Sequence, residues 1–277
     1  MEIGIFAKTF SVRGADANLQ AVQAAGFQCA QFNFSCVGLP SMPDFIPVRI
    51  VSEILEASRS RHVRLAALSA TYNMIHPDHA QRVAGMRKLE TMMQSAGAMG
   101  MSLLSLCTGT CDPHDQWKHH PDNQSPHSWK ILRSEMETAL ALAEKYQVDL
   151  AIEPELANVV NSATAANQIC MEINSPRLHV ILDPANLFEA SQVQQQQKII
   201  ADAVECLGDR IIMTHAKDRD SEGHVVAPGN GIVDFEYFAK CLSSVKFRGP
   251  VITHGLPESE VKAAAMYLRR IFQQGPV

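Results

Sequence analysis

Four short apolar runs in the second half of the chain each end at a residue type that binds metal ions. The runs close on Glu153, Asp183, His215 and His254, in the segments Ala151-Ile152-Glu153, Ile181-Leu182-Asp183, Met213-Thr214-His215 and Ile252-Thr253-His254. Mixed carboxylate and imidazole ligands suit Mn²⁺, Zn²⁺, Co²⁺ or Fe²⁺, and we keep Mg²⁺ as a further candidate. Any one of these residues could be polar only because strands end at solvent. Four such ends together predict one bound divalent metal ion as cofactor.

The elements that must position these residues alternate along the chain. Short β-branched or apolar runs are followed by longer segments with helical spacing of apolar residues, which predicts βα repetition. The predicted strands are 2–10, 29–34, 64–72, 102–109, 150–155, 178–183, 211–217 and 250–255. The predicted helices are 16–25, 48–61, 80–99, 128–146, 163–174, 194–207, 235–243 and 258–272.

Eight βα units can close a parallel sheet so that no edge stays unpaired. We therefore predict an α/β fold, a (β/α)8 TIM barrel forming a single domain over residues 1–277, with its active site at the C-terminal ends of the strands. An open doubly wound sheet is the alternative. It is disfavoured because the first βα turn lacks a Gly-x-Gly-x-x-Gly and no phosphate-binding loop occurs elsewhere.

Composition restricts the partners. The formal net charge is -5 and the basic residues are scattered, so the sequence offers no long electropositive surface and predicts no nucleic-acid partner. It contains neither a signal-like N-terminus nor a membrane-length apolar segment, which predicts a cytoplasmic protein without a membrane partner. The seven cysteines are an odd number without zinc-ribbon spacing, so no disulfide framework is expected. A homo-oligomer is compatible with the sequence.

Several longer motifs carry a family resemblance. They are Ile152-Glu153-Pro154-Glu155 with Asn158, Leu182-Asp183-Pro184-Ala185-Asn186, His215-Ala216-Lys217-Asp218, and Pro228-Gly229-Asn230-Gly231 leading to Asp234-Phe235. In order and spacing the chain resembles the xylose isomerase-like barrel superfamily, specifically its sugar phosphate isomerase and epimerase branch. The resemblance covers nearly the whole chain. It implies metal-binding roles for Glu153, Asp183 and His215.

Two positions depart from the family pattern. A substrate-contacting histidine often found three residues after the aspartate is Asn186 here, and we expect Asn186 to contact the substrate in its place. The usual metal-binding glutamate that closes the eighth strand is His254. In epimerases of this family, carboxylates on strands five and eight act as paired bases, so the resemblance implies a catalytic role for Glu153. Imidazole can be either a metal ligand or a general acid/base, and both roles stay open for His254.

Glu155 and Lys217 lie two residues beyond Glu153 and His215. In a regular strand each pair would point to the same side, so either residue could supply the missing base. The alternatives are a surface carboxylate for Glu155 and a salt bridge for Lys217.

Loop residues complete the predicted site. We expect Asn73, His76 and Thr108 to contact substrate hydroxyls, although turn and cap chemistry explains Asn73 and His76 equally well. Trp117 lies in a polar loop and could cover the ligand or anchor the loop. Arg219, with Lys217, would meet a phosphate or carboxylate.

The resemblance implies a metal-dependent isomerase or epimerase that acts on a sugar, polyol or sugar phosphate through an enediolate. One alternative is a dehydratase of a cyclic polyol on the same site. Less favoured are a metal-dependent phosphodiesterase of the endonuclease type, which needs more metal ligands and a basic surface, and a non-catalytic sugar-binding barrel.

Overall fold

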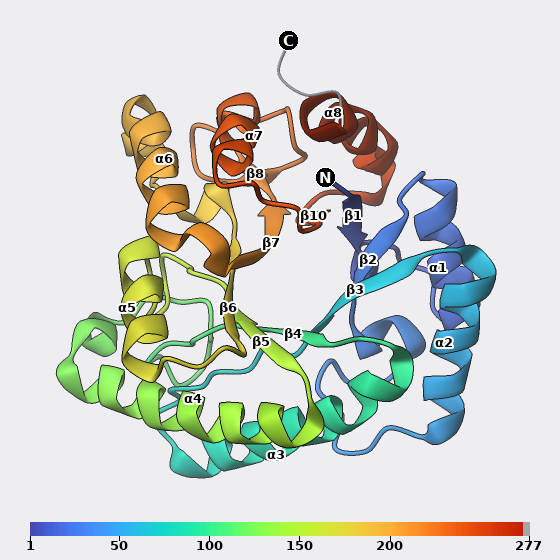
Figure 1. Ribbon diagram of the computed structural model, residues 1–277, viewed down its shortest axis with the longest axis horizontal. Coiled ribbons are helices and arrows are strands. Elements are labelled where there is room, and N and C mark those ends of the chain that lie inside the picture. Colours follow the sequence, from blue (N-terminus) through green and yellow to red (C-terminus); the bar gives the residue numbers. More distant parts are fainter. Residues whose placement is uncertain (274–277) are drawn as a thin grey trace.

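The computed structural model describes residues 1–273, which form a closed barrel of eight parallel strands surrounded by helices (Figure 1). Around the barrel the strands follow the order β1-β10-β7-β6-β5-β4-β3-β2. Their bounds are β1 Ile3–Phe6, β2 Cys29–Phe32, β3 Arg64–Ser69, β4 Leu103–Leu106, β5 Asp149–Ile152, β6 Leu178–Leu182, β7 Ile211–Ala216 and β10 Val251–Thr253. The predicted TIM barrel is confirmed, and the open sheet is excluded because β1 pairs with both β2 and β10.

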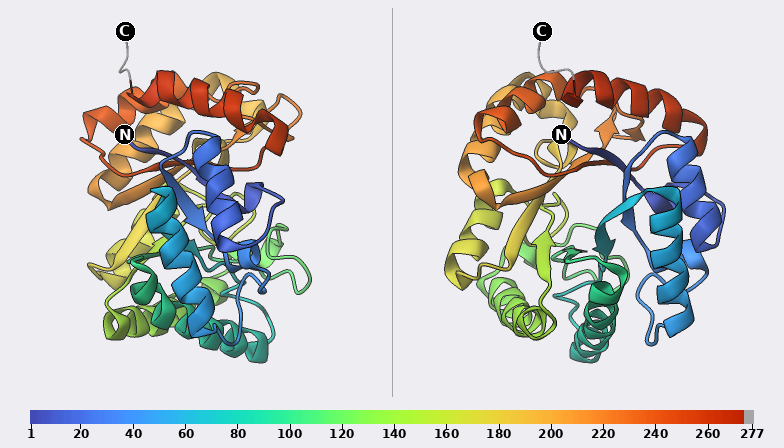
Figure 2. Two further views of the ribbon diagram at one scale, coloured as in Figure 1. Left: turned by 90° about the vertical axis from the view of Figure 1, so that its right-hand side faces the viewer. Right: turned by 45° about the vertical axis from the view of Figure 1, so that its right-hand side comes forward.

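Helices cover the outside of the barrel, and Figure 2 shows them packed around the central strands from two further sides. Their bounds are α1 Ala15–Ala24, α2 Val48–Arg61, α3 His79–Ala96, α4 Pro126–Tyr146, α5 Ala163–Ile173, α6 Gln196–Leu207, α7 Phe235–Ser244 and α8 Val261–Gln273. Within residues 1–273, no helix combines the length and the apolar character that crossing a membrane requires.

Several helices begin at a capping side chain on the loop that leaves a strand. Asp78 accepts a hydrogen bond from the Ala80 amide at 2.8 Å, and Ser125 accepts one from Ser128 at 3.1 Å. Asp234 accepts a hydrogen bond from the Tyr237 amide at 2.9 Å. Each cap satisfies a first-turn N–H group that has no partner within its helix. At α3, α4 and α7 a single polar residue therefore stabilises the helix start, and with it the end of the preceding loop.

Apolar side chains form two separate layers. The larger lies between the strands and the helices. The smaller takes at least one residue from every barrel strand, and so forms a ring inside the barrel: Phe6, Cys29, Ala66, Ala67, Leu103, Ala151, Ile181, Met213 and Ile252. Because side chains alternate along a strand, a residue two positions after a ring residue also points inward, one layer nearer the mouth.

The predicted elements differ from the structure mainly at their ends. The first predicted strand is too long, because β1 stops at Phe6 and Ala7–Thr9 forms a 3-10 turn. The sixth helix begins at Gln196, after a 3-10 segment over Ala190–Gln195. A short antiparallel pair, β8 Asp218–Arg219 and β9 Val225–Val226, was not predicted. The last part of the predicted domain, residues 274–277, lies outside the described residues.

Candidate metal centre

The alternation of the barrel strands places all four predicted metal-ligand residues inside the barrel mouth. Each stands two positions after a residue of the inner apolar ring: Glu153 after Ala151, Asp183 after Ile181, His215 after Met213 and His254 after Ile252. Strands β5, β6, β7 and β10 are consecutive neighbours in the barrel, so the four side chains converge from one half of the mouth. One ligand atom from each residue lies within 4.8 Å of the other three.

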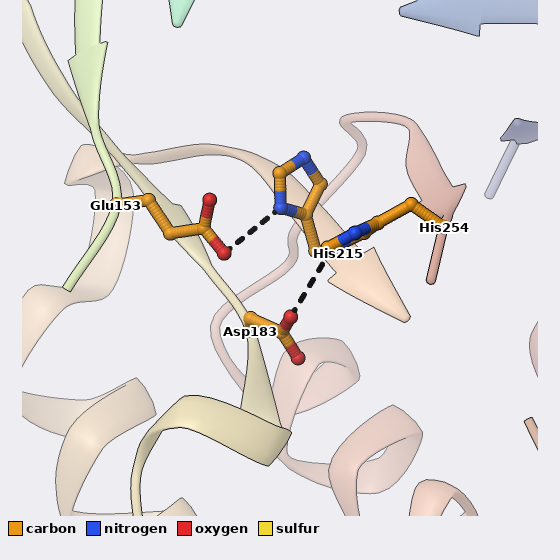
Figure 3. A group of neighbouring side chains, drawn as sticks. All are labelled: Glu153, Asp183, His215 and His254. Carbon is orange, nitrogen blue, oxygen red and sulfur yellow. Dashed lines mark ion pairs between the residues drawn. The ribbon is translucent and has the colours of Figure 1, made fainter. Parts of the chain in front are cut away.

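The distances within this cluster are short (Figure 3). Glu153 Oε1 lies 3.0 Å from Nδ1 of His215, and Asp183 Oδ2 lies 3.4 Å from Nε2 of His254. The two imidazole rings meet edge to face with their centroids 4.5 Å apart. The other carboxylate oxygen of Asp183, Oδ1, accepts a hydrogen bond from the Ala185 amide at 3.0 Å, which fixes the orientation of the side chain. Four fixed donors therefore face one small volume.

Three of these donor atoms are buried without a hydrogen bond: Asp183 Oδ2, His215 Nδ1 and His254 Nε2. All three lie within ion-pair distance of a carboxylate or an imidazole in the cluster, yet the directions are not those of hydrogen bonds. A buried polar atom without a partner is costly, and native proteins rarely leave three at one point. Two carboxylates and two imidazoles aimed together form a cluster that could hold a divalent metal ion.

The electrostatics of the cluster favour ionised carboxylates. Burial opposes ionisation of Asp183, but the charges of Lys217 and His254 outweigh it and lower the pKa of Asp183 to about 2. Burial likewise works against the Glu153 carboxylate, while the attraction of His215 brings the pKa of Glu153 below its ordinary value. Burial, with repulsion from His215, lowers the pKa of His254. Ionised carboxylates and a neutral imidazole are the forms that bind metal ions.

A second polar group adjoins the cluster. Lys217 Nζ lies 3.8 Å from Asp183 Oδ2 and 3.8 Å from Glu155 Oε2, and it donates to Oδ1 of Asn186 at 2.5 Å. Asn186 in turn donates from Nδ2 to Glu153 Oε1 at 3.0 Å. Burial raises the pKa of Glu155, although Lys217 partly opposes this rise. The nearby carboxylates of Asp183 and Glu155 raise the pKa of Lys217 despite its burial, so Lys217 is held as a cation.

A cavity of about 330 Å³ opens over the cluster. Its lining includes Glu153, Glu155, His215, Lys217 and His254, together with Phe6, Lys8, Gln31, Ser69, Thr71, Ser105, Leu106 and Trp117. Trp117 is about half exposed at 49% and offers an apolar face on the loop after β4. The cavity therefore combines the metal-ligand cluster, two lysines and apolar ring surface.

Five of the residues predicted to contact substrate do not line this cavity. Asn73 and His76 line a neighbouring cavity of about 420 Å³. The Asn73 amide binds the backbone of Thr110 through both its oxygen and its nitrogen, and His76 accepts from the Asp78 amide. Thr108 is fully buried and accepts from the Val160 amide.

Arg219 and Asn186 are the other two. Arg219 Nη1 lies 3.9 Å from Glu189 Oε2. Asn186 bonds instead to Glu153 and Lys217 beside the cluster. For Asn73 and His76, these turn and cap contacts are the alternative that the sequence left open.

Five polar residues that line the cavity were not predicted from the sequence: Lys8, Gln31, Ser69, Thr71 and Ser105. Gln31, Ser69 and Ser105 each follow a ring residue by two positions, as the metal-ligand residues do. A polar residue at that spacing after an apolar one was the available signal. Lys8 was hidden inside a predicted strand that ends at Phe6.

Comparison with known proteins agrees with this architecture. The family model of the xylose isomerase-like TIM barrel matches residues 19–271. No curated protein matches the sequence significantly.

Solved structures share the fold. The apo form of 3-keto-D-glucoside 4-epimerase from E. coli has a TM-score of 0.77 at 16% identity, covering 98% of this chain and 99% of that chain. D-Psicose 3-epimerase with D-tagatose, from Clostridium cellulolyticum H10, gives 0.76 at 14% identity and covers 98% and 99%. The IOLI protein with a binding zinc atom gives 0.77 at 16% identity and covers 99% of each chain. At these identities the likeness establishes the fold alone.

Proposed function

Because the chain belongs to the xylose isomerase-like TIM barrel family, we propose that it is a divalent-metal-dependent isomerase or epimerase of a sugar, polyol or sugar phosphate. The observation that carries this proposal is the convergence of Glu153, Asp183, His215 and His254, three of which present buried atoms without hydrogen bonds. These four residues would hold the ion. A divalent ion bound there would act as a Lewis acid toward a substrate carbonyl and its neighbouring hydroxyl.

Mixed nitrogen and oxygen donors narrow the choice of metal. Two imidazoles beside two carboxylates favour Mn²⁺, Zn²⁺, Co²⁺ or Fe²⁺ over Mg²⁺, which prefers oxygen ligands and retains water. The zinc atom named for the IOLI protein is in keeping with this donor preference.

Glu155 is the better placed of the candidate bases. It lines the cavity beyond the cluster, and burial raises its pKa, which brings the carboxyl closer to the range where it can both accept and return a proton near neutral pH. Lys217, held as a cation next to it, would stabilise negative charge that develops on a substrate oxygen. An isomerase moves one proton between adjacent carbons, so a single base is sufficient. An epimerase needs a group on each face of the carbon, and Glu153 and His254 are the candidates for the second.

The cavity fits a small carbohydrate. A volume of about 330 Å³ lies at the lower end of the range for small-molecule sites. Trp117 and Phe6 provide ring surface, while Asn186 holds Lys217 and Glu153 in place. The sugars named for the two epimerases of the same fold support this substrate class.

One rival function needs more metal ligands than the described residues offer, and two others differ from the proposed function in the reaction alone. A phosphodiesterase of the endonuclease type uses several metal ions, whereas residues 1–273 contain one group of three or more potential metal ligands. Dehydration of a cyclic polyol would use the same site, and the product distinguishes it. A sugar-binding barrel without turnover would bind metal and sugar but exchange no substrate proton.

Metal content tests the site. We expect the protein purified with added Mn²⁺ or Zn²⁺ to hold one ion per chain, and Glu153→Gln, Asp183→Asn and His215→Ala each to lose it while remaining folded by circular dichroism. His179→Ala is the matched control, because His179 lies near the opposite end of β6 from Asp183 and should keep the ion. Full metal occupancy in all three cluster variants would refute the site.

Solvent isotope exchange tests the reaction. Ketohexoses, aldoses, inosose-type polyols and sugar phosphates are incubated with the metal-loaded protein in D₂O and followed by NMR. An isomerase or epimerase incorporates deuterium next to the carbonyl and yields an isomer of the substrate. A product that has lost one water relative to the substrate would favour the dehydratase. A loaded protein that exchanges no substrate in the panel would count against catalysis.

A further inference from the structure

A chain of buried polar side chains crosses the barrel behind the metal-ligand cluster. Nε2 of His215 lies 2.7 Å from Oε1 of Gln31, and Gln31 donates from Nε2 to Ser105 Oγ at 2.9 Å. The three residues come from β7, β2 and β4, and none is more than 3% exposed. Figure 3 shows that the His215 nitrogen involved is the one pointing away from Glu153.

We propose that Gln31, held by Ser105, is a positioning residue that fixes the tautomer of His215 for metal binding; this inference rests on the metal site of the proposed function. An amide oxygen can only accept a hydrogen bond, so the Nε2 atom of His215 must carry the hydrogen. A neutral imidazole protonated at Nε2 has a free lone pair on Nδ1. Nδ1 is the atom that faces the cluster and makes no hydrogen bond of its own.

Without this contact the other tautomer would be favoured. Glu153 Oε1 lies only 3.0 Å from Nδ1, and a carboxylate attracts an N–H group. A proton on Nδ1 would occupy the lone pair that a metal ion needs, and binding would have to displace it. Gln31 opposes that arrangement by offering an acceptor on the opposite side of the ring. Partners of this kind orient metal-bound histidines and set which nitrogen is protonated.

Ser105 anchors the end of the Gln31 amide that faces away from the histidine. Its hydroxyl accepts from Gln31 Nε2 while Oε1 faces His215. Loss of this acceptor would allow the amide to turn its NH₂ toward Nε2, which then could only accept. Ser69 pairs with Ser105 in the β3–β4 register and lines the same cavity, but lies outside this hydrogen-bonded chain. Ser69→Ala is therefore a matched control for Ser105→Ala.

The first test reads the tautomer directly in metal-free protein. ¹⁵N NMR of the histidine side chains distinguishes a protonated Nε2 from a protonated Nδ1, and His215→Gln identifies the His215 signals. We expect protonated Nε2 in the parent, in Gln31→Glu, whose carboxylate still accepts, and in Ser69→Ala. Gln31→Met and Ser105→Ala should shift the population toward protonated Nδ1. An unchanged His215 spectrum in folded Gln31→Met would overturn the proposal.

The second test measures affinity for Zn²⁺ and Mn²⁺ by competition with a chelator. We expect Gln31→Met to weaken binding roughly 10–100-fold, the usual cost of removing an outer partner of a metal-bound histidine. Gln31→Glu should retain affinity, Ser105→Ala should lie between, and Ser69→Ala should match the parent. If the parent binds no metal, the proposed function fails, whereas the tautomer measurement still decides the role of Gln31. Equal affinity in the parent and Gln31→Met would also refute the role.

Discussion

Nε2 of His254 lies 3.4 Å from Oδ2 of Asp183, at the strand end where the family resemblance leads us to expect a glutamate. The imidazole thus occupies a position that a carboxylate fills in relatives, and the cluster contains two negative donors in place of three. A divalent ion would then be fully balanced by Glu153 and Asp183 alone. It would retain more Lewis acidity than an ion in a shell with three carboxylates.

Substitution of His254 tests whether this residue coordinates the metal ion. We expect His254→Ala to weaken Zn²⁺ binding more than the roughly 10–100-fold that the loss of an outer partner costs, because a donor atom itself is removed. His254→Glu should keep the metal. Without metal its third carboxylate repels Asp183 and Glu153, so its melting temperature should fall below that of the parent and recover when Zn²⁺ is added. Unaltered affinity in His254→Ala would show that His254 is not a ligand.

Glu155 is a candidate base whose burial lowers the stability of the folded protein at neutral pH. Burial raises the pKa of this carboxyl in the folded protein above its unfolded value, so the unfolded chain releases the proton first as the pH rises. The folded state therefore has its full stability below the unfolded pKa of Glu155 and loses stability as the pH rises through the folded pKa. Above that pH the protein bears the cost of burying an ionised carboxylate. We expect Glu155→Gln to remove it. The variant should melt a few degrees higher than the parent at pH 7.5, and the difference should shrink toward pH 4.

The same variant should lose the isotope exchange if Glu155 is the base. Higher stability with lost activity is the pattern expected where a buried charge is retained for function. Melting curves at both pH values, beside exchange rates, provide the check. A variant that melts lower than the parent at pH 7.5 would show that the Lys217 contact dominates over burial. Glu205→Gln, a change at an exposed carboxylate of α6, controls for the loss of a charge.

Much of the barrel and the cluster was predictable because strand-like and helix-like segments alternate along the chain and the strand-like runs end at ligand residue types. Apolar runs that end in Glu153, Asp183, His215 and His254 report where strands stop, and parallel strands bring such ends together. Asn186 was reached only through the family resemblance. The structure shows its amide bridging Glu153 and Lys217, a contact that spacing along the chain does not reveal.

The loops were less predictable because their polar residues serve the backbone as readily as a ligand. Asn73 and His76 have the residue types of a binding loop, but their side chains bind the backbone of Thr110, Pro113 and Asp78. No pattern in the sequence separates these uses. Gln31 was missed for a related reason, since its partner His215 lies 184 residues away in the sequence.

Asp218 illustrates a polar residue whose importance is structural. Its Oδ2 accepts from the amides of Gly229 and Gly231 at 2.9 and 3.0 Å, and its Oδ1 accepts from Arg219 and Val233 at 2.9 and 3.1 Å. The side chain is fully buried, so these bonds fold the loop after β7 back onto the barrel. The β8–β9 pair and the position of Lys217 depend on that loop.

We expect Asp218→Asn to destabilise the protein by about 3 kcal/mol, because asparagine offers one acceptor oxygen and its NH₂ group would leave two buried N–H groups unpaired. Urea unfolding measures the change. Asp220→Asn is the matched control, since Asp220 lies in the same hairpin but accepts the backbone amides of Glu222 and His224 through Oδ1 alone. Its Oδ2 meets the exposed ring of His224 at 3.2 Å. One amide oxygen can keep both of those bonds, so its cost should stay below about 0.5 kcal/mol, as for other exposed changes. Equal stabilities of the two variants would mean that the four bonds to Asp218 do not hold the loop, and the position of Lys217 would then need another explanation.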